Sequence, residues 1–390
     1  MVTKIKNGRL ILPGSMTEQP LYIENDCILS VGGDIPADRV IDAEGQYVSP
    51  GFVDIHLHGG GGCEFVDGTE DAVLRASDIH ARHGTTTLFP TVSSYETDVT
   101  IRALDAVKTV RDREHLHVPD CVRPHIPGVH LEGPYFSPKQ TGAQDPSHIR
   151  TPKRAEYEPI LERYGDLIRR WSFAPELPGT DDFIDALRTH GILPAAGHTD
   201  AAYADVLRAH ERGMSLITHL YSCTSTVTRV GGFRIPGVIE SAYLLDGMDV
   251  EIIADGCHLP PELIRLIVKI KGVDRTCLVT DAIRYGGMDN VDHVSDPNGN
   301  VPYIIEDGVV KLADRSAFAG SIATMDRLVR VCVQKAGIPL TDAVRMASTT
   351  PARVMGLSDR GRIAPGLRAD LVLLDDALTV TRVLIDGKEF

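Results

Sequence analysis

The middle of the chain alternates between short apolar runs and longer amphipathic stretches. The runs are Gly51–His58, Thr85–Pro90, Ile126–Leu131, Arg170–Ala174, Ile192–Ala196, Met214–His219, Val250–Ala254 and Arg275–Thr280. Between them, apolar residues recur at helical spacing, as in Thr180–Thr189, Ala201–Glu211 and Pro261–Lys269. An apolar run followed by an amphipathic helix is the repeating unit of a parallel α/β sheet. Eight such units predict a TIM-like (β/α)8 barrel.

The two ends of the chain have a different pattern. Short β-like pieces broken by turns fill residues 1–50, and two more strands are expected at Ala369–Leu374 and Val380–Ile385. The dipeptides Asn7-Gly8 and Gly32-Gly33 are typical of hairpin turns. We therefore expect a small β-sandwich domain built from residues 1–50 together with 356–390. The barrel, residues 51–355, is inserted between these two segments.

Composition narrows the class of protein. A chain of 390 residues with 43% hydrophobic content is too long for a single small core. The net charge of −14 disfavours nucleic acid and anionic membranes as partners, although local Arg and His decide whether a small anion binds. No apolar stretch is long enough to span a bilayer, and Met1–Leu10 lacks a signal-peptide core. The seven scattered cysteines contain no C-x-x-C pair, which favours reduced thiols in the cytoplasm.

One long segment has no helical pattern. Asp289–Asn300 is rich in Asp, Asn and Gly, so we expect a surface loop or flap there.

Two histidines end the first apolar run, in Asp54-Ile55-His56-Leu57-His58. A strand alternates its side chains with period two, so His56 and His58 share one face with Asp54. A glycine loop follows directly. Two imidazoles on one face can hold a divalent metal, but taken alone the pair also fits two hydrogen-bonded strand histidines.

Polar side chains also end four more apolar runs. Together with the histidine pair, they favour a metal site over separate structural histidines. Run three ends at Glu132, run five at His198, run six at His219 and run eight at Asp281. A barrel gathers its strand ends at one mouth, so we expect these groups to meet. Mixed histidine and carboxylate ligands suit zinc, and also iron or manganese. The remaining histidines have a structural interpretation, with His130 at most supporting the metal ligands. Cys63, Cys223 and Cys257 near the mouth are expected to be packing thiols.

Several motifs together resemble a known family. They are Pro50-Gly51-Phe52-Val53-Asp54, Leu131-Glu132-Gly133-Pro134, Gly197-His198-Thr199, Thr218-His219-Leu220-Tyr221, Ile252-Ile253-Ala254-Asp255-Gly256-x-His258, Leu278-Val279-Thr280-Asp281-Ala282 and Ala319-Gly320-Ser321. In these residues, and over essentially its whole length, the chain resembles the amidohydrolase superfamily and, within it, the N-acetylglucosamine-6-phosphate deacetylases. The glutamate in Glu-Gly-Pro distinguishes this branch, because many other members use a carboxylated lysine between two metals.

The resemblance implies a role for each residue of the predicted metal site. Glu132, His198 and His219 match the family's principal metal ligands. His56 and His58 match a second-metal pair that only some members have. The expected cofactor is therefore one or two divalent ions per subunit, with zinc as the first choice and iron or manganese as alternatives. Asp281 matches the catalytic acid/base.

The resemblance also implies a substrate end of the site. Residues matched to substrate contacts are Ala143, Gln144, Ser222, Cys223, Arg234, His258, Phe318, Ala319 and Gly320. Arg234 and His258 match positions that help to hold a sugar phosphate. The chain departs from the family where Ser222-Cys223 replaces the usual Asn-Ala, where Gln144 replaces a frequent His, and in a longer stretch before Arg234.

The expected activity is metal-dependent hydrolysis of the acetamide of N-acetylglucosamine-6-phosphate, giving glucosamine-6-phosphate and acetate in amino sugar catabolism. The metal would activate water, and Asp281 would move the proton to the departing amine. A homodimer is expected by resemblance, because family members can complete the phosphate pocket with a neighbour's arginine. Two alternatives remain open: a different N-acyl substrate, such as a galactosamine epimer or an unphosphorylated sugar, and a non-catalytic scaffold. The scaffold is disfavoured because buried polar groups are costly to keep.

Overall fold

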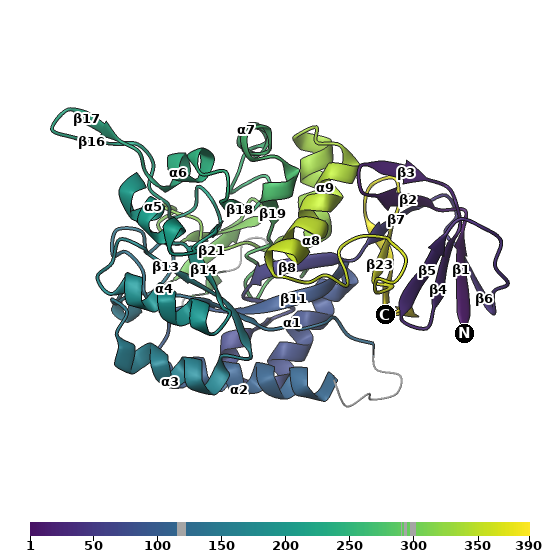
Figure 1. Ribbon diagram of the computed structural model, residues 1–390, viewed down its shortest axis with the longest axis horizontal. Helices are drawn as coiled ribbons and strands as arrows, with labels where there is room; N and C mark the ends of the chain where they lie inside the picture. The colour runs from purple at the N-terminus through teal and green to yellow at the C-terminus, as the bar shows by residue number, and fades with distance from the viewer. Residues whose placement is uncertain (115–121, 290, 292–294, 297–301) are drawn as a thin grey trace.

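The computed structural model describes residues 1–114, 122–289, 291, 295–296 and 302–390. Eight parallel strands stand side by side in chain order, with helices on their outer face (Figure 1). They are β8 (Phe52–Leu57), β11 (Thr85–Val92), β12 (Val129–Glu132), β13 (Ile168–Phe173), β14 (Leu193–Ala196), β15 (Leu216–Ile217), β18 (Asp249–Ile252) and β19 (Thr276–Leu278). Each lies within one of the predicted apolar runs or overlaps it, so the predicted barrel is confirmed.

The last strand meets the first at the carboxyl ends of the strands. The Asp281 backbone N–H donates to the His56 carbonyl oxygen at 2.9 Å, and that of His58 donates to Ala282 at 2.7 Å. Below these bonds, the Asp54 carboxylate accepts a hydrogen bond of 2.6 Å from the Thr280 hydroxyl. The barrel is therefore closed by the segments that carry the candidate chemistry.

The helices bury one apolar face each. Their bounds are α1 Glu70–Arg82, α2 Thr97–Glu114, α3 Arg154–Tyr164, α4 Thr180–Thr189, α5 Tyr203–Glu211, α6 Val238–Leu244, α7 Pro261–Lys271, α8 Met325–Arg330, α9 Leu340–Ala347 and α10 Thr349–Val354. In α4, Phe183, Ile184 and Leu187 are fully buried, and their spacing places them on one face. Single turns lie at Phe65–Asp67, Pro146–His148, Val273–Arg275 and Val331–Lys335. The helices predicted at α4, α5 and α7 are confirmed.

Strands from the two chain ends form two sheets beside the barrel (Figure 1). One sheet contains β5 (Cys27–Val31), β4 (Leu21–Glu24), β1 (Val2–Lys6) and β6 (Arg39–Asp42). The other contains β25 (Lys388–Glu389), β24 (Val380–Ile385), β23 (Leu371–Leu374), β7 (Tyr47–Pro50), β2 (Arg9–Leu12) and β3 (Ser15–Thr17). Buried Ile5 and Leu21 of the first sheet share a core with Leu10 and Leu371 of the second. This β-sandwich supports the proposed division into residues 1–50 with 356–390 and residues 51–355.

The hairpin turns predicted in this region are wrong. Asn7-Gly8 connects β1 to β2, which lie in different sheets. The Asn7 amide donates to both carboxylate oxygens of Asp42 at 3.0 Å, so the turn is held as a corner between the sheets. Gly32-Gly33 follows β5 and leads to β6, and these strands lie at opposite edges of one sheet. Glycine permits the turn, but long-range pairing decides which strands it joins.

Three smaller β elements lie around the barrel mouth. β9 (Gly59–Gly60) pairs with β10 (Cys63–Glu64), and the hairpin β16 (Thr228–Val230) to β17 (Phe233–Ile235) projects from the barrel (Figure 1). β20 (Ser295–Asp296), β21 (Tyr303–Glu306) and β22 (Val309–Leu312) form a third sheet. Of the predicted loop 289–300, residues 290, 292–294 and 297–300 lie outside the described residues. Among the described helices, none is both long and apolar enough to cross a membrane.

Candidate active site

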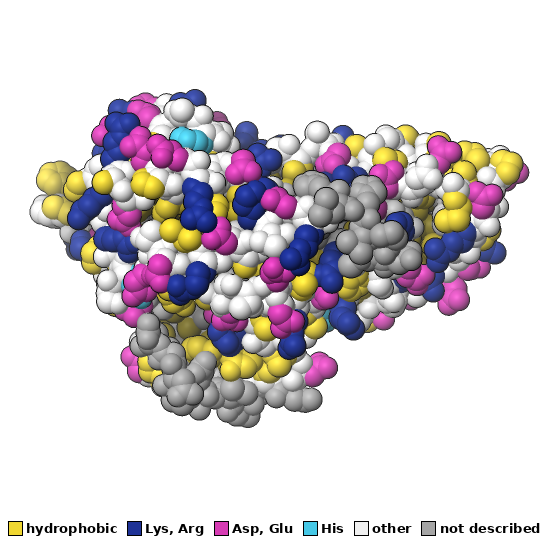
Figure 2. All heavy atoms as spheres, turned by 90° about the horizontal axis from the view of Figure 1, so that it is seen from below, with side chains coloured by type: hydrophobic (Ala, Val, Ile, Leu, Met, Phe, Trp, Pro, Cys, Tyr) yellow, Lys and Arg dark blue, Asp and Glu magenta, His cyan; other side chains and the backbone are white. Residues whose placement is uncertain are grey.

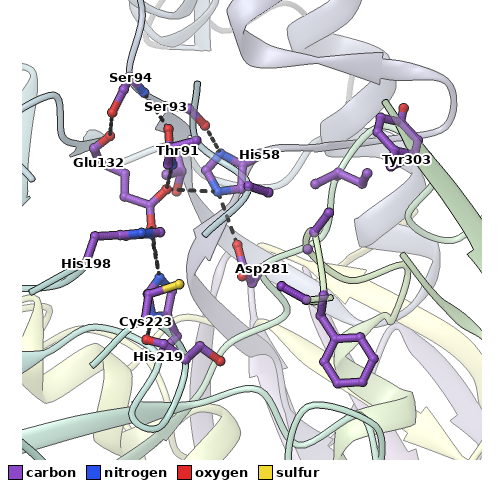
Figure 3. Close-up of a pocket in the computed structure, with 18 of the residues that line it drawn as sticks. His58, Thr91, Ser93, Ser94, Glu132, His198, His219, Cys223, Asp281 and Tyr303 are labelled. Atoms are coloured by element: carbon purple, nitrogen blue, oxygen red, sulfur yellow. Dashed lines mark hydrogen bonds and ion pairs between the residues drawn. The ribbon is translucent and has the colours of Figure 1, made fainter. Parts of the chain in front are cut away.

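The predicted site residues line one cavity of about 440 Å³ at the barrel mouth (Figure 3). Those on its wall are His58, Glu132, Ala143, Gln144, His198, His219, Ser222, Cys223, His258, Asp281, Phe318, Ala319 and Gly320. His56 is fully buried behind them. Arg234 does not line the cavity of its own chain.

Glu132 lies at the centre of the polar cluster. Its Oε1 is 3.0 Å from His219 Nε2 and 3.3 Å from His198 Nε2, on one side. Its Oε2 is 3.4 Å from His58 Nε2, and its Oε1 is also 3.4 Å from His56 Nε2. The carboxylate thus faces two histidine pairs, His198 with His219 and His56 with His58, and each pair with Glu132 could hold one metal ion.

All four histidines point Nε2 inward and use Nδ1 to bind an outer partner. His198 Nδ1 donates to the Gln140 carbonyl oxygen at 2.9 Å, and His219 Nδ1 donates to that of Ser222 at 3.1 Å. His56 Nδ1 contacts Glu251 at 3.2 Å. His58 Nδ1 contacts the Ser93 hydroxyl at 2.9 Å (Figure 3). A carbonyl oxygen only accepts, so Nδ1 of His198 and His219 carries a proton, and in the neutral ring this leaves Nε2 with a lone pair. Metal-binding histidines are held in this way.

The backbone at three strand ends adopts an unusual conformation. His198, His219 and Asp281 have φ angles of 47°, 29° and 47°, in the left-handed region that residues other than glycine rarely adopt. Each follows the last residues of a barrel strand, so the turn directs its side chain over the mouth. Non-glycine residues held in this region concentrate at functional sites, because the rest of the fold maintains the conformation.

The cluster is electrostatically unbalanced without added positive charge. Burial lowers the pKa of His56, but the carboxylates of Asp281 and Glu132 outweigh burial and raise it to about 9. The same balance raises the pKa of His58 to about 10. Burial raises the pKa of Glu132, but the facing histidines hold it well below its usual range. The two carboxylates therefore demand cationic partners, either protons on the histidines or a metal ion.

The site fits a divalent metal by the chemistry of its donors. His56 Nε2 is buried and has no hydrogen-bond partner, a state that buried polar atoms rarely tolerate. Separations of 3.0–3.4 Å between the Nε2 atoms and the Glu132 oxygens are those expected for atoms around one small ion. Nitrogen and oxygen donors of this kind suit zinc, iron or manganese.

Asp281 lies beside the second histidine pair. Its Oδ1 is 3.1 Å from His58 Nε2 and 3.3 Å from His56 Nε2. Burial raises its pKa, but these histidines outweigh burial and lower it to about 2. Asp281 is therefore a carboxylate at neutral pH, on the cavity wall, and is able to accept a proton.

The opposite wall carries the residues matched to the sugar. His258 donates from Nδ1 to Asp255 at 2.8 Å, which fixes its ring against the cavity. The Phe318 ring lies 4.9 Å from the His258 ring, and Ala319 and Gly320 follow it on the wall. Ser222 and Cys223 form part of the loop after β15 and line the cavity beside His219 and His198 (Figure 3).

Arg234 lies apart from these residues. It is in β17, opposite Arg229 in the projecting hairpin, and its side chain is exposed. The longer stretch expected from the sequence before Arg234 is this hairpin. Val230 and Phe233 at its tip are 64% and 76% exposed. Figure 2 shows hydrophobic side chains at the left end, where the hairpin projects, and also at the right end and along the lower edge, with positive and negative side chains interspersed between them.

Sequence reasoning missed the polar groups inside the barrel that hold the site. Glu251 of β18 accepts from both Arg170 of β13 and His56, and all three are fully buried. His130, interpreted as supporting the ligands, bonds Thr91 at 3.1 Å and packs against the His56 ring. A charged residue inside each of two apolar runs was the available signal, since unpaired buried charges are avoided.

The chain belongs to the amidohydrolase family, whose sequence pattern matches residues 47–390. The resemblance inferred from the motifs is confirmed. Within the family, the chain is 30% identical over 405 residues to N-acetylglucosamine-6-phosphate deacetylase of Bos taurus, a match that covers 99% of this chain and 95% of that protein. It is also 31% identical to N-acetylgalactosamine-6-phosphate deacetylase of Shewanella sp., over 98% of this chain and 94% of that protein.

Solved structures agree with this placement. The N-acetylglucosamine-6-phosphate deacetylase of Pasteurella multocida is 28% identical, with a TM-score of 0.90 and complete coverage of both chains. A mutant of the Mycobacterium smegmatis enzyme, in complex with N-acetyl-D-glucosamine-6-phosphate, is 32% identical with a TM-score of 0.88. That match covers 100% of this chain and 98% of the other. The whole fold is therefore shared with amino sugar phosphate deacetylases.

Proposed function

We propose that this protein is a metal-dependent deacetylase that hydrolyses N-acetylglucosamine-6-phosphate to glucosamine-6-phosphate and acetate. One observation carries the proposal: four histidines aim Nε2 at one shared carboxylate, and Asp281 lies beside them on the cavity wall. The similarity to deacetylases over the whole chain supports the same substrate class.

The proposed metal ligands are Glu132, His198 and His219, with His56 and His58 at a second position. The chemistry supplied by a divalent ion there is activation of water and polarisation of the amide carbonyl. Zinc is the proposed ion, with iron or manganese as alternatives, because all three accept mixed imidazole and carboxylate donors.

Asp281 is the proposed general acid and base. It is a carboxylate at neutral pH, so it can take the proton of the attacking water at Oδ1 or Oδ2. It then returns this proton to the amide nitrogen as the carbon–nitrogen bond breaks, which turns a poor leaving group into a neutral amine. The Thr280 hydroxyl donates to the Asp54 carboxylate, which holds the residue just before Asp281 in place.

The substrate end is proposed to hold the sugar by the opposite wall. His258, oriented by Asp255, is within reach of a sugar hydroxyl or of the carbonyl oxygen, and the Phe318 ring and Ala319 offer apolar contact. Ala143 and Gly320 also line the cavity, and Ser222 and Cys223 line it beside the histidines. The galactosamine epimer is the second candidate substrate, because a relative named for it is as similar as those named for the glucosamine compound.

Arg234 is proposed to act across a homodimer. It is remote from the cavity of its own chain, yet it lies on a hairpin whose exposed apolar tip is suited to burial against another subunit. An Arg–phosphate contact contributes about 1.5–3 kcal/mol. Arg234→Ala should therefore raise KM for the phosphorylated sugar about tenfold to a hundredfold and leave kcat nearly unchanged.

Subunit mixing tests the location of this arginine. Under subsaturating substrate, Arg234→Ala alone should be slowed about tenfold to a hundredfold, and Asp281→Asn alone should be slowed about 10²–10⁴-fold. A mixed dimer contains one site with an intact Asp281 and the arginine of the partner, so activity returns if Arg234 acts across the interface. Absence of recovery, with mixing verified by mass, would show that Arg234 acts within its own chain or not at all.

The proposed setting is the cytoplasm, with a small amino sugar phosphate as the partner and with neither nucleic acid nor membrane. The six described cysteines form no disulfide, which supports a reducing compartment.

A substrate panel tests the proposed activity. Amine release by the metal-loaded enzyme would be compared for N-acetylglucosamine-6-phosphate, its unphosphorylated form and N-acetylgalactosamine-6-phosphate. Fast turnover of the first compound alone supports the proposal. Faster turnover of N-acetylgalactosamine-6-phosphate would move the substrate assignment to the galactosamine compound. Absence of turnover on all three compounds would contradict deacetylation of these sugars.

A further inference from the structure

Gln144 makes two hydrogen bonds that fix its orientation. Its Oε1 accepts from the Ser94 backbone N–H at 3.1 Å, and its Nε2 donates to Glu132 Oε2 at 2.9 Å. A backbone N–H can only donate and a carboxylate can only accept. The amide therefore has one allowed orientation, with its N–H directed at the carboxylate.

This contact falls on one particular oxygen of Glu132. Oε1 faces His219, His198 and also His56, whereas Oε2 faces only His58, and Gln144 binds Oε2. Glu132 is only 2% exposed, so its carboxylate depends on protein partners for most of its hydrogen bonds. Among the described residues, Gln144 is the one donor to this carboxylate whose hydrogen bond does not come from a histidine.

We propose that Gln144 is a positioning residue that holds Glu132 as a bridge between two metal positions, and so controls filling of the His56–His58 position. The inference rests on the proposed metal-dependent function. It assigns to Gln144 a role distinct from the substrate contact expected for it.

The two positions depend on Glu132 unequally. His198 and His219 converge on Oε1 with their rings anchored by carbonyl oxygens, and Oε1 lies closest to them. At the His56–His58 position, His58 faces Oε2 at 3.4 Å and His56 faces Oε1 at 3.4 Å, so Oε2 has a single histidine contact. When the amide is lost, Oε1 keeps its three histidine contacts, whereas Oε2 keeps only His58, so the carboxylate contact of the His56–His58 position is the first to weaken.

Metal affinity measured without substrate tests this inference. The fully folded protein, stripped by a chelator, would be titrated with Zn²⁺ against a competing chromophoric chelator for the natural chain, Gln144→Met and Gln144→His. Methionine keeps the length of the side chain and removes the donor, whereas histidine can still donate. Outer partners of metal ligands contribute about tenfold to a hundredfold in affinity.

The natural chain is expected to bind two Zn²⁺ ions. In Gln144→Met the affinity of the weaker site should fall about tenfold to a hundredfold, or binding there should be lost. Gln144→His should retain this site. Gln140→Met is the matched control, because its side chain bonds Asp200 at 3.4 Å and only its backbone oxygen meets His198. The visible spectrum of Co²⁺-loaded protein would show the same loss of one site.

Two results would overturn the inference. One is a natural chain that binds a single ion, and the other is a Gln144→Met variant with both affinities unchanged. A natural chain that binds no ion at all would instead contradict the proposed metal-dependent function, so the two failures are distinguishable. Thermal unfolding of each variant shows whether the protein has folded.

Discussion

Two clusters of histidine and carboxylate lie at opposite ends of the barrel, and they differ in what balances their charge. At the mouth, Glu132 and Asp281 form ion pairs only with histidines among the described residues. At the base, just before β12, His125 Nε2 is 3.4 Å from Asp386 and 3.6 Å from Asp370.

The base cluster already contains its own cation. Arg368 donates to Asp386 at 2.6 Å, and the Asp386 backbone N–H donates to Asp370 at 2.9 Å. Burial lowers the pKa of His125, but Asp370 and Asp386 outweigh burial and raise it to about 9, so the ring is an imidazolium that joins the barrel to the terminal strands. At the base, histidine and carboxylate side chains therefore form a network of ion pairs. At the mouth, the same residue types are arranged so that they can hold a metal ion.

The largest expected effect separates the two clusters. Glu132→Gln at the mouth should remove bound metal and reduce turnover by more than the 10²–10⁴-fold that one acid–base group contributes, because both histidine pairs share this carboxylate. Asp370→Asn at the base should leave metal content and kcat unchanged. Elemental analysis measures the metal content of both variants, and steady-state kinetics measures their kcat. Loss of metal in Asp370→Asn would erase the proposed distinction.

The second largest effect should separate metal binding from proton transfer at the barrel mouth. Asp281→Asn keeps the shape of the side chain and should retain metal, whereas kcat falls about 10²–10⁴-fold because no group moves the proton. Metal content and kcat would be measured on the same preparation. A kcat near that of the natural chain would show that Asp281 is not the acid/base.

The smallest effect concerns stability at the base. A pKa of His125 raised from 6.5 to about 9 stabilises the fold fully below pH 6.5, and this contribution is lost as pH rises through about 9. His125→Gln should therefore lower the free energy of unfolding by about 2 kcal/mol at pH 6 and by much less at pH 10.

Thermal unfolding of the natural chain and this variant at both pH values makes the comparison. A stability difference that is the same at pH 6 and pH 10 would show that His125 acts by packing and not as a cation. Turnover at pH 7 is the control and should not change.

Much of the barrel and of its mouth was predictable from local pattern. The eight apolar runs became the eight strands, because period and burial are properties of short segments. His56, Glu132, His198, His219 and Asp281 stood at strand ends, and parallel strands bring those ends together. Because parallel strand ends converge, these residues could be expected around one cavity although they lie far apart in the chain.

Contacts between distant segments were decided only by the tertiary structure. Asn7-Gly8 has a hairpin sequence, yet it turns a corner between sheets, because pairing of β1 with β6 is a long-range choice. Arg234 reads as a phosphate ligand, yet it lies on an exposed hairpin. The pairing of Glu251 with Arg170 and His56, and of Gln144 with Glu132, joins different strands and loops. A single sequence records residue types and local spacing, but which polar groups satisfy one another is settled when the core closes and excludes water.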